Sequence, residues 1–430
     1  MTRCAILAGV LCLALSGCTT WPRSYGTRPC CVTTKPAVKR QSIGWHLFDV
    51  TVNSQIKRAF DLTRLSRRLL GVPVRASNLQ GGEVPDSAFF TNRDNRDPAR
   101  LSPEEVRWGP TRPEDIARPP FLITKPKTEG RTPGFFVTDA KGTRYLLKCD
   151  PVDAPELLSG AEAVTSKLLY ALGYHVPSYE VVVFRPEELQ LGPGVMARDR
   201  HGHRHPLTET EVRPMVEARV REGKLRVVAS RIVEGDILGP ATFKRFRDCA
   251  EVRALKVAYA WLNNTDAKDH NSLLVWNGKE TVGYLIDFGT SLGADAGTEG
   301  PKNPCAGWLN IVDLQEASLK LLTFGLHQPV CEPVARPVSP SVGLFSPRVD
   351  PDQWKPYAPN LAFQEMNQDD ARWMARRMAR LSLDQIQAAV SAGQYSDPAD
   401  AAYLVDVLEK RRRAIVHHYL HGAHAEGPSR

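Results

Sequence analysis

The spacing of apolar residues divides the chain into a β-rich part and a longer helical part. Residues 119–150, PPFLITKPKTEGRTPGFFVTDAKGTRYLLKCD, alternate β-type runs with turn residues and predict three strands. Apolar residues over 159–172 have helical spacing, which predicts a helix that Gly173 ends. A further strand is expected near 179–184. Residues 365–422 are amphipathic throughout. This order predicts an α+β fold with a β-rich N-lobe that contains one helix, followed by a mainly helical C-lobe.

The segment that precedes these strands combines one predicted helix with an irregular arm. Residues 41–72 have apolar side chains at helical spacing, which predicts a helix, and these are Ile56, Ala59, Phe60, Leu62, Leu65, Leu69 and Leu70. Residues 73–118 are rich in Pro, Asp, Arg and Asn, and Ser102 is expected to open a short helix there. We therefore predict a helix and arm over 41–118, an N-lobe over 119–235 and a C-lobe over 236–425.

The length and composition of the chain are those of a folded globular protein. The chain has 430 residues, enough for a large core, and its 42% hydrophobic and 24% charged content is typical of globular proteins. The formal charge of +8 is spread along the sequence, without a basic stripe interleaved with aromatic residues. The charge therefore leaves a nucleic-acid partner open without arguing for one, and it suits phosphorylated ligands equally well.

The N-terminus has the features of an export signal. MTRCAILAGVLCLALSGC contains one cation, Arg3, and an apolar run over 5–15 that is too short to span a bilayer. The run ends in LSGC, which resembles the lipobox of bacterial lipoproteins. The resemblance implies that a signal peptide, 1–17, is removed and that Cys18 carries lipid. Since Thr follows Cys18 in place of Asp, it also implies an outer-membrane location facing the periplasm, with residues 18–40 as a tether.

Two alternatives to this anchor stay open. The chain could carry a plain secretory signal with a chance cysteine, or its start codon could be misassigned, which would make it cytoplasmic. Exported chains can form disulfides, and six cysteines follow residue 18. No pair has zinc-ligand spacing, and we expect a bond between Cys305 and Cys331.

The candidate chemistry begins with a polar island between two apolar segments. WLNNTDAKDHNSLLVW, residues 261–276, places Asp266, Lys268 and Asn271 between stretches of buried character. Asp287-Phe288-Gly289 follows 21 residues after Asp266, directly behind an apolar strand. Carboxylates and amides at such positions can hold a metal ion and accept a proton, as phosphoryl transfer requires.

The pattern D-x-K-x-x-N followed by D-F-G resembles the protein-kinase-like superfamily. The resemblance covers about 120–420 and implies its bilobal fold. Asn264-Thr265 replaces the usual His-Arg before the first aspartate, and the loop KTEGRTPGF, 127–135, has two glycines in place of three. These departures are similar to the atypical branches: HipA-type bacterial kinases, phosphoinositide kinases and secretory-pathway casein kinases. AEAVTSKLLYALGYHVPSYEVVVF is similar to HipA-like proteins, and VPDSAFFTNR resembles a group of bacterial kinase-like proteins.

The resemblance implies a nucleotide site in the N-lobe. Lys148, at the end of the third predicted strand, would contact the α- and β-phosphates of ATP, and Glu162 would hold its ammonium group. The 127–135 loop would cradle phosphate oxygens through Gly130 and Gly134, with Lys127 as an additional cation.

The resemblance likewise implies a metal and acceptor site in the C-lobe. Asn271 and Asp287 would bind Mg²⁺, Asp266 would accept the proton of the acceptor hydroxyl, and Lys268 would offset charge on the transferred group. The sequence thus indicates an ATP- and Mg²⁺-dependent phosphotransferase with an unknown protein or small-molecule acceptor. Alternatives are a catalytically inactive kinase-like binding module, an AMP-transferring pseudokinase, or a cytoplasmic HipA-like kinase.

Overall fold

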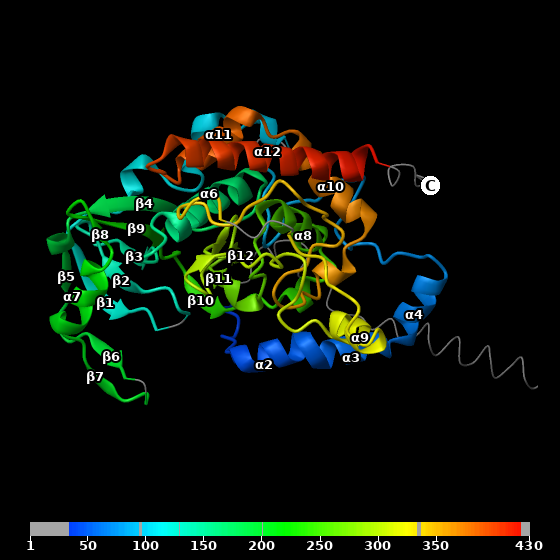
Figure 1. Cartoon of the computed structure of the whole chain (residues 1–430), viewed down its shortest axis with the longest axis horizontal. Coiled ribbons are helices and arrows are strands. Elements are labelled where there is room, and N and C mark those ends of the chain that lie inside the picture. The colour runs from blue at the N-terminus through cyan, green and yellow to red at the C-terminus, as the bar shows by residue number, and fades with distance from the viewer. Residues whose placement is uncertain (1–33, 94–96, 129, 200, 333–336, 423–430) are drawn as a thin grey trace, which may run out of the picture.

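The protein has a mixed α+β architecture in which a β-rich region adjoins a mainly helical one (Figure 1). The computed structural model describes residues 34–93, 97–128, 130–199, 201–332 and 337–422. The predicted signal peptide, Cys18 and most of the predicted tether therefore lie outside the described residues. None of the helices within the described ranges is long and apolar enough to cross a membrane.

The larger sheet has seven strands in the order β4-β9-β3-β2-β1-β5, with β8 paired to β9. They are β1 (Phe121–Pro126), β2 (Gly134–Thr138), β3 (Arg144–Cys149), β4 (Tyr179–Phe184), β5 (Leu189–Leu191), β8 (Val220–Arg221) and β9 (Lys224–Arg231). A three-stranded sheet contains β10 (Asp236–Gly239), β11 (Ser272–Trp276) and β12 (Thr281–Leu285). Two further pairs join β6 (Met196–Arg198) to β7 (Arg204–Pro206), and β13 (Ala294–Asp295) to β14 (Gly300–Pro301).

The helices lie along the whole described chain, and the longest one, α12, ends it. The described α-helices are α2 (Ile43–Phe48), α3 (Ser54–Ala59), α4 (Leu62–Leu69), α5 (Pro103–Trp108), α6 (Leu157–Ala171), α7 (Glu209–Glu217), α8 (Ala250–Leu262), α9 (Leu314–Leu322), α10 (Gln368–Ala379), α11 (Leu383–Ser391) and α12 (Pro398–Leu420). A π-helix, η2 (Asp49–Asn53), joins α2 to α3. The short 3₁₀ turns are η3 (Pro98–Arg100), η4 (Pro113–Asp115), η5 (Pro186–Glu188), η6 (Phe243–Phe246), η7 (Asp269–Asn271) and η8 (Phe363–Glu365).

The predicted core elements are confirmed. β1, β2 and β3 are the three strands expected within 119–150, and β4 is the strand expected near 179–184. The helix expected over 159–172 is α6, and the chain leaves it at Gly173, whose φ of +108° is one that side chains disfavour. Ser102 caps α5 in a reciprocal capping box with Glu105. The disulfide expected between Cys305 and Cys331 is present.

The prediction of one helix over 41–72 is wrong. The structure has three short α-helices there, separated by the π-helix η2 and by a break at Phe60 and Asp61. The apolar positions that supported the prediction are largely exposed, among them Phe60, Leu62, Leu69 and Leu70. Helical spacing identifies an apolar face but does not show whether that face meets a core.

The predicted tether is too long at its C-terminal end, because the last residues of 18–40 pack on the fold. The Lys39 amide donates to the carbonyl of Leu238 in β10 at 2.7 Å. A Cβ at Gly239 would lie 2.1 Å from the Lys39 carbonyl oxygen, so only glycine permits this approach. Lys35 also pairs with Asp236 at 2.8 Å. The N-terminal segment is thus attached beside β10 before α2 begins.

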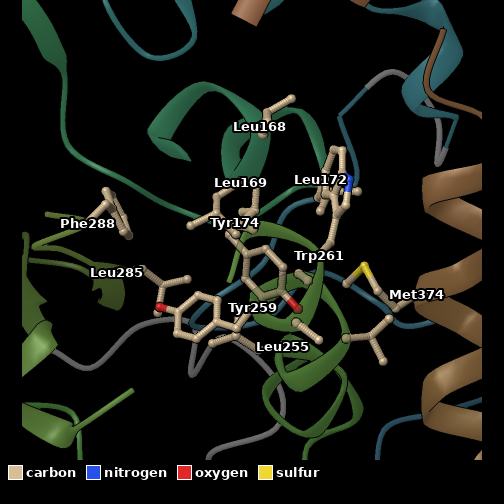
Figure 2. Packing of buried hydrophobic residues seen from close by; sticks show 14 of the residues in the cluster. Leu168, Leu169, Leu172, Tyr174, Leu255, Tyr259, Trp261, Leu285, Phe288 and Met374 are labelled. Carbon is tan, nitrogen blue, oxygen red and sulfur yellow. The ribbon is translucent and has the colours of Figure 1, made fainter. Parts of the chain in front are cut away.

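One large core joins α6 to the C-terminal helices and to the arm. Figure 2 shows how Tyr174, Tyr259 and Trp261 pack with leucines of α6 and with Met374 of α10. The arm contributes Phe90, whose ring lies 5.2 Å from that of Trp373 (in α10), centroid to centroid. The irregular arm is therefore part of the core, and α6 is fixed between the sheet and the helical region.

Candidate functional site

Three charged side chains from distant parts of the chain meet at the end of β3. Lys148 Nζ donates to Glu162 Oε1 of α6 and to Asp287 Oδ1, each at 2.7 Å. Lys148 and Glu162 are almost fully buried, while 41% of the Asp287 side chain is exposed. The ion triad, Lys148 with Glu162 and Asp287, therefore has one carboxylate open to an incoming ligand.

When Lys148, Glu162 and Asp287 are all ionised, the triad carries one more negative charge than positive. Burial alone would lower the pKa of Lys148, but the carboxylates of Asp287 and Glu162 outweigh it and raise that pKa above its ordinary value. For Asp287, burial would raise the pKa, but the charge and hydrogen bond of Lys148 together with the charges of Lys268 and Lys127 outweigh it and lower that pKa. For Glu162, burial outweighs Lys148 and raises the pKa to about 7. The net charge is thus best balanced when a further cation approaches Asp287.

The β11–β12 hairpin brings the two predicted metal ligands to one place. Ser272 at the start of β11 pairs with Leu285 at the end of β12, so Asn271 and Asp287 lie just beyond the same end of the hairpin. The Ile286 amide donates to the Asn271 carbonyl at 3.0 Å across this end. Residues 16 positions apart in sequence therefore become neighbours through strand pairing.

Asp287 itself has a backbone conformation that L-residues rarely adopt. Its φ is +61°, and its amide donates to the Tyr179 hydroxyl of β4 at 3.0 Å. A left-handed conformation at a residue other than glycine costs of order 1–3 kcal/mol and is maintained only by surrounding contacts. Here the ion pair and the Tyr179 contact hold the carboxylate toward Lys148.

The polar island divides into two sets of residues with different partners. Lys268 Nζ donates to Asp266 Oδ2 at 2.5 Å, and Asn271 Nδ2 donates to the Asp266 carbonyl at 2.8 Å. Asp269 instead accepts from the Phe243 amide at 3.0 Å, and His270 Nε2 lies 3.1 Å from the Gln41 carbonyl oxygen. Asp266, Lys268 and Asn271 thus form the catalytic-loop candidate, whereas Asp269 and His270 attach the loop to its surroundings.

The loop before β2 approaches the triad through Lys127. Its ammonium donates to the Thr132 carbonyl at 2.9 Å and lies near enough to lower the pKa of both Glu162 and Asp287. Gly130 has a φ of +72°, which suits a tight phosphate-binding turn. Gly134 lies in β2 rather than in the loop, and a Cβ there would come within 2.3 Å of the Leu147 carbonyl oxygen. Strand pairing beside Lys148 therefore explains this glycine.

Sequence patterns gave no indication of Lys302. Its buried ammonium donates to the Asn263 carbonyl, the Thr265 hydroxyl and the Thr290 carbonyl at 2.7–3.0 Å. It thereby joins the start of the polar island to the segment after Asp287. Burial lowers the pKa of Lys302 to about 7. A Lys between Pro and Asn in an irregular stretch has no local signature, and only the three-dimensional contacts identify it.

The residues present fit a magnesium ion held partly by phosphate. The described residues include no cluster of three or more His, Cys, Asp or Glu side chains suited to a metal ion. Mg²⁺ in nucleotide sites is commonly held by one or two protein oxygens together with phosphates and waters, which Asp287 and Asn271 can supply. Oε2 of Glu162 is buried without a hydrogen-bond partner, so it too would gain from added positive charge nearby.

No protein-family model matches the chain, and neither does any curated protein sequence. Among solved structures, it is similar to the Helicobacter pylori proinflammatory kinase CtkA, at 11% identity over 70% of this chain and 94% of that one, with a TM-score of 0.35. It is also similar to the Golgi casein kinase with Mn/ADP bound, at 10% identity over 90% of this chain and 94% of that one, with a TM-score of 0.31. Because these scores are low, functional inference depends on the side-chain geometry.

The raised pKa of Glu162 gives a pH test of the triad. A carboxyl group with a higher pKa in the folded state adds stability at low pH, and this contribution is lost as the pH rises from about 4.5 through about 7. We expect Glu162→Gln to gain stability relative to wild type by on the order of 2 kcal/mol between pH 5 and 8. Urea unfolding at several pH values measures this difference.

The change of the stability difference with pH is the relevant quantity, because Glu162→Gln also alters the hydrogen bond to Lys148 at every pH. Glu187→Gln, at an exposed position in η5, is the matched control and should follow wild type across the same range. A stability difference between Glu162→Gln and wild type that stays constant from pH 5 to 8 would contradict the pKa assignment.

Proposed function

We propose that the protein is an ATP- and Mg²⁺-dependent phosphotransferase of the atypical, HipA-like kinase type. The observation that carries this proposal is the contact of Lys148 with both Glu162 and Asp287, residues 14 and 139 positions away in sequence. A buried lysine between a helix carboxylate and a partly open loop carboxylate is a suitable phosphate-binding cation. The carboxylates keep it charged, and α6 fixes its direction.

In this proposal the nucleotide phosphates lie between the 127–135 loop and the end of the β11–β12 hairpin. Lys148 contacts the α- and β-phosphates and Glu162 keeps its ammonium in place. Lys127 and the turn at Gly130 bind the phosphate oxygens from the other side. The charges of Lys127 and Lys268 both reach Asp287, which supports a single site formed by these elements.

Asp287 and Asn271 are the proposed Mg²⁺ ligands. When bound, the ion neutralises phosphate charge and so favours transfer of the terminal phosphoryl group. Asp287 is already directed to the site by Lys148 and Tyr179, so little reorganisation is needed. Asn271 would use its carboxamide oxygen, because its Nδ2 is engaged by the Asp266 carbonyl.

Asp266 is the proposed proton acceptor for the attacking hydroxyl group. Its Oδ2 forms an ion pair with Lys268, and 23% of the side chain of each of these two residues is exposed. Lys268 thus orients the carboxylate and provides a positive charge beside the transferred group. Lys302 acts as a positioning residue by fixing the backbone at Asn263 and Thr265, just before Asp266.

We expect Mg²⁺ with ATP to raise the melting temperature of the purified chain by several degrees, because ligand binding to the folded state is stabilising. Asp287→Ala should abolish this increase, since it removes both a metal ligand and a partner of Lys148. Asp153→Ala, an exposed turn residue, is the control and should keep the increase. Differential scanning fluorimetry with and without EDTA measures all three proteins.

The position of a radiolabel then identifies the reaction. Transfer of label from the γ-phosphate of ATP to an acceptor or to the chain supports phosphoryl transfer, and Asp266→Asn should reduce it by about 100-fold or more. Transfer from the α-phosphate would instead establish an AMP-transferring enzyme. An absent melting shift with every nucleotide and metal tested would contradict the proposal and favour a binding module.

We also propose that Cys18 anchors the chain to the cell envelope, facing the periplasm. The support is the sequence LSGC after a signal-type apolar run. In a bacterial host, labelled palmitate should be incorporated into the wild-type chain and not into Cys18→Ala. Cys149→Ala is the control, since this buried thiol should leave labelling unchanged. An unlabelled wild-type chain in the cytoplasmic fraction would contradict the anchor.

A further inference from the structure

An exposed apolar surface lies at the N-terminal end of the described fold. α4 and its flanks present Phe60, Leu62, Leu65, Leu69 and Leu70 to solvent, and 79% of Leu69 is exposed. Leu62, Leu65 and Leu69 follow i, i+3, i+7 spacing and lie on one face of α4. This leucine face, residues 60–70, contacts none of the described residues closely enough to bury it.

A second apolar cluster, the 321–326 cluster, lies at the end of α9. It contains Leu321, Leu322, Phe324 and Leu326, all strongly exposed, with Phe324 at 97%. α9 lies beside α3, the helix that leads into α4. Gln55 of α3 and Leu314 of α9 line one groove of about 620 Å³, and α4 follows α3 after two residues (Figure 1). A large solvent-exposed apolar surface of this kind indicates a binding surface.

The charges around the leucine face identify the type of partner. Residues 57–68 contain five cations and one anion, Asp61. Arg64 and Arg67 lie on the side of α4 opposite Leu62, Leu65 and Leu69, at the helical positions between them. A short basic amphipathic helix with exposed leucines has the composition of an interfacial helix that binds anionic lipid. A protein partner would not require this separation of arginines from leucines.

The length of chain before the fold agrees with a membrane at this surface. Residues 18–33 could span at most about 55 Å when extended, and the described chain then runs through 34–42 into α2 and on to α4. An anchor at Cys18, which is part of the proposed function, would keep the leucine face within reach of a bilayer. Stable membrane attachment commonly needs two such signals, a lipid and a second surface.

We propose that the leucine face and the 321–326 cluster dock the folded protein onto an anionic phospholipid surface. The apolar side chains enter the headgroup region, and the positive charges of Lys57, Arg64 and Arg67 add electrostatic attraction to the anionic lipids. The N-terminal segment also contacts the residues that attach the catalytic-loop candidate to its surroundings, since Gln41 Nε2 donates to Asp269 Oδ2 at 3.3 Å. Docking therefore places the candidate site at a fixed position relative to the membrane.

Hydrogen–deuterium exchange of the full chain carrying Cys18→Ala tests this docking without acyl chains. With vesicles of anionic phospholipid, we expect amides of 60–72 and 321–326 to exchange at least threefold more slowly. With zwitterionic vesicles the change should be small. Because exchange reports each segment separately, binding through the apolar run 5–15 is distinguished from docking by the fold.

Two pairs of variants give the decisive comparison. One variant combines Leu65→Glu with Leu69→Glu, and a second combines Arg64→Glu with Arg67→Glu. Each should remove the protection of 60–72 and weaken vesicle binding about tenfold. Leu383→Glu in α11 and Arg204→Glu in β7 alter exposed residues on elements remote from this surface and should change neither (Figure 1).

Two results would overturn the proposal. One is vesicle-bound chain in which 60–72 and 321–326 exchange as they do in solution. The other is protection of these segments that depends on protein concentration and appears without lipid, which would assign the surface to a protein partner. Leu65, Leu69, Leu383 and Arg204 are exposed, and Arg64 and Arg67 are half-buried, so equal melting temperatures are required to establish that the variants are folded.

Discussion

The buried charge of Lys148 is the constraint on which the site depends. An ammonium group removed from water requires anionic partners, and loss of one partner from a buried pair costs about 3–5 kcal/mol. Two carboxylates supply this compensation, one from α6 and one from the segment after β12. The contact therefore fixes the sheet, α6 and the β11–β12 hairpin relative to one another, and it leaves the partly exposed Asp287 available to a metal ion.

The local pattern predicted the elements that build this site. The resemblance to the protein-kinase-like superfamily implied that Lys148 would meet Glu162 and Asp287, whereas alternation identified β1 to β4 and helical spacing identified α6. These signals are short-range, since periodicity and turn residues act within a few positions. The pattern could not separate Asp269 and His270 from their functional neighbours, because their partners, Phe243 and Gln41, lie far away in sequence.

The errors of prediction have a common physical origin in tertiary context. Apolar spacing over 41–72 predicted one α-helix, whereas the segment changes to a π-helix at η2, breaks at Phe60 and exposes much of its apolar face. Gly134 was assigned to a phosphate-binding loop, although the Leu147 carbonyl explains it. Lys302 went unnoticed because its three acceptors are brought together only by the fold. An exposed apolar face is informative in its own right, since it indicates a surface that binds something else.

The central claim is that Lys148 binds the phosphates of a nucleotide. A lysine-reactive acyl-phosphate derivative of ATP, followed by peptide mass spectrometry, tests it directly, because the probe acylates a lysine held against its phosphates. We expect modification of Lys148 that excess ATP with Mg²⁺ prevents. Modification spread over exposed lysines, unaffected by ATP and absent at Lys148, would contradict it.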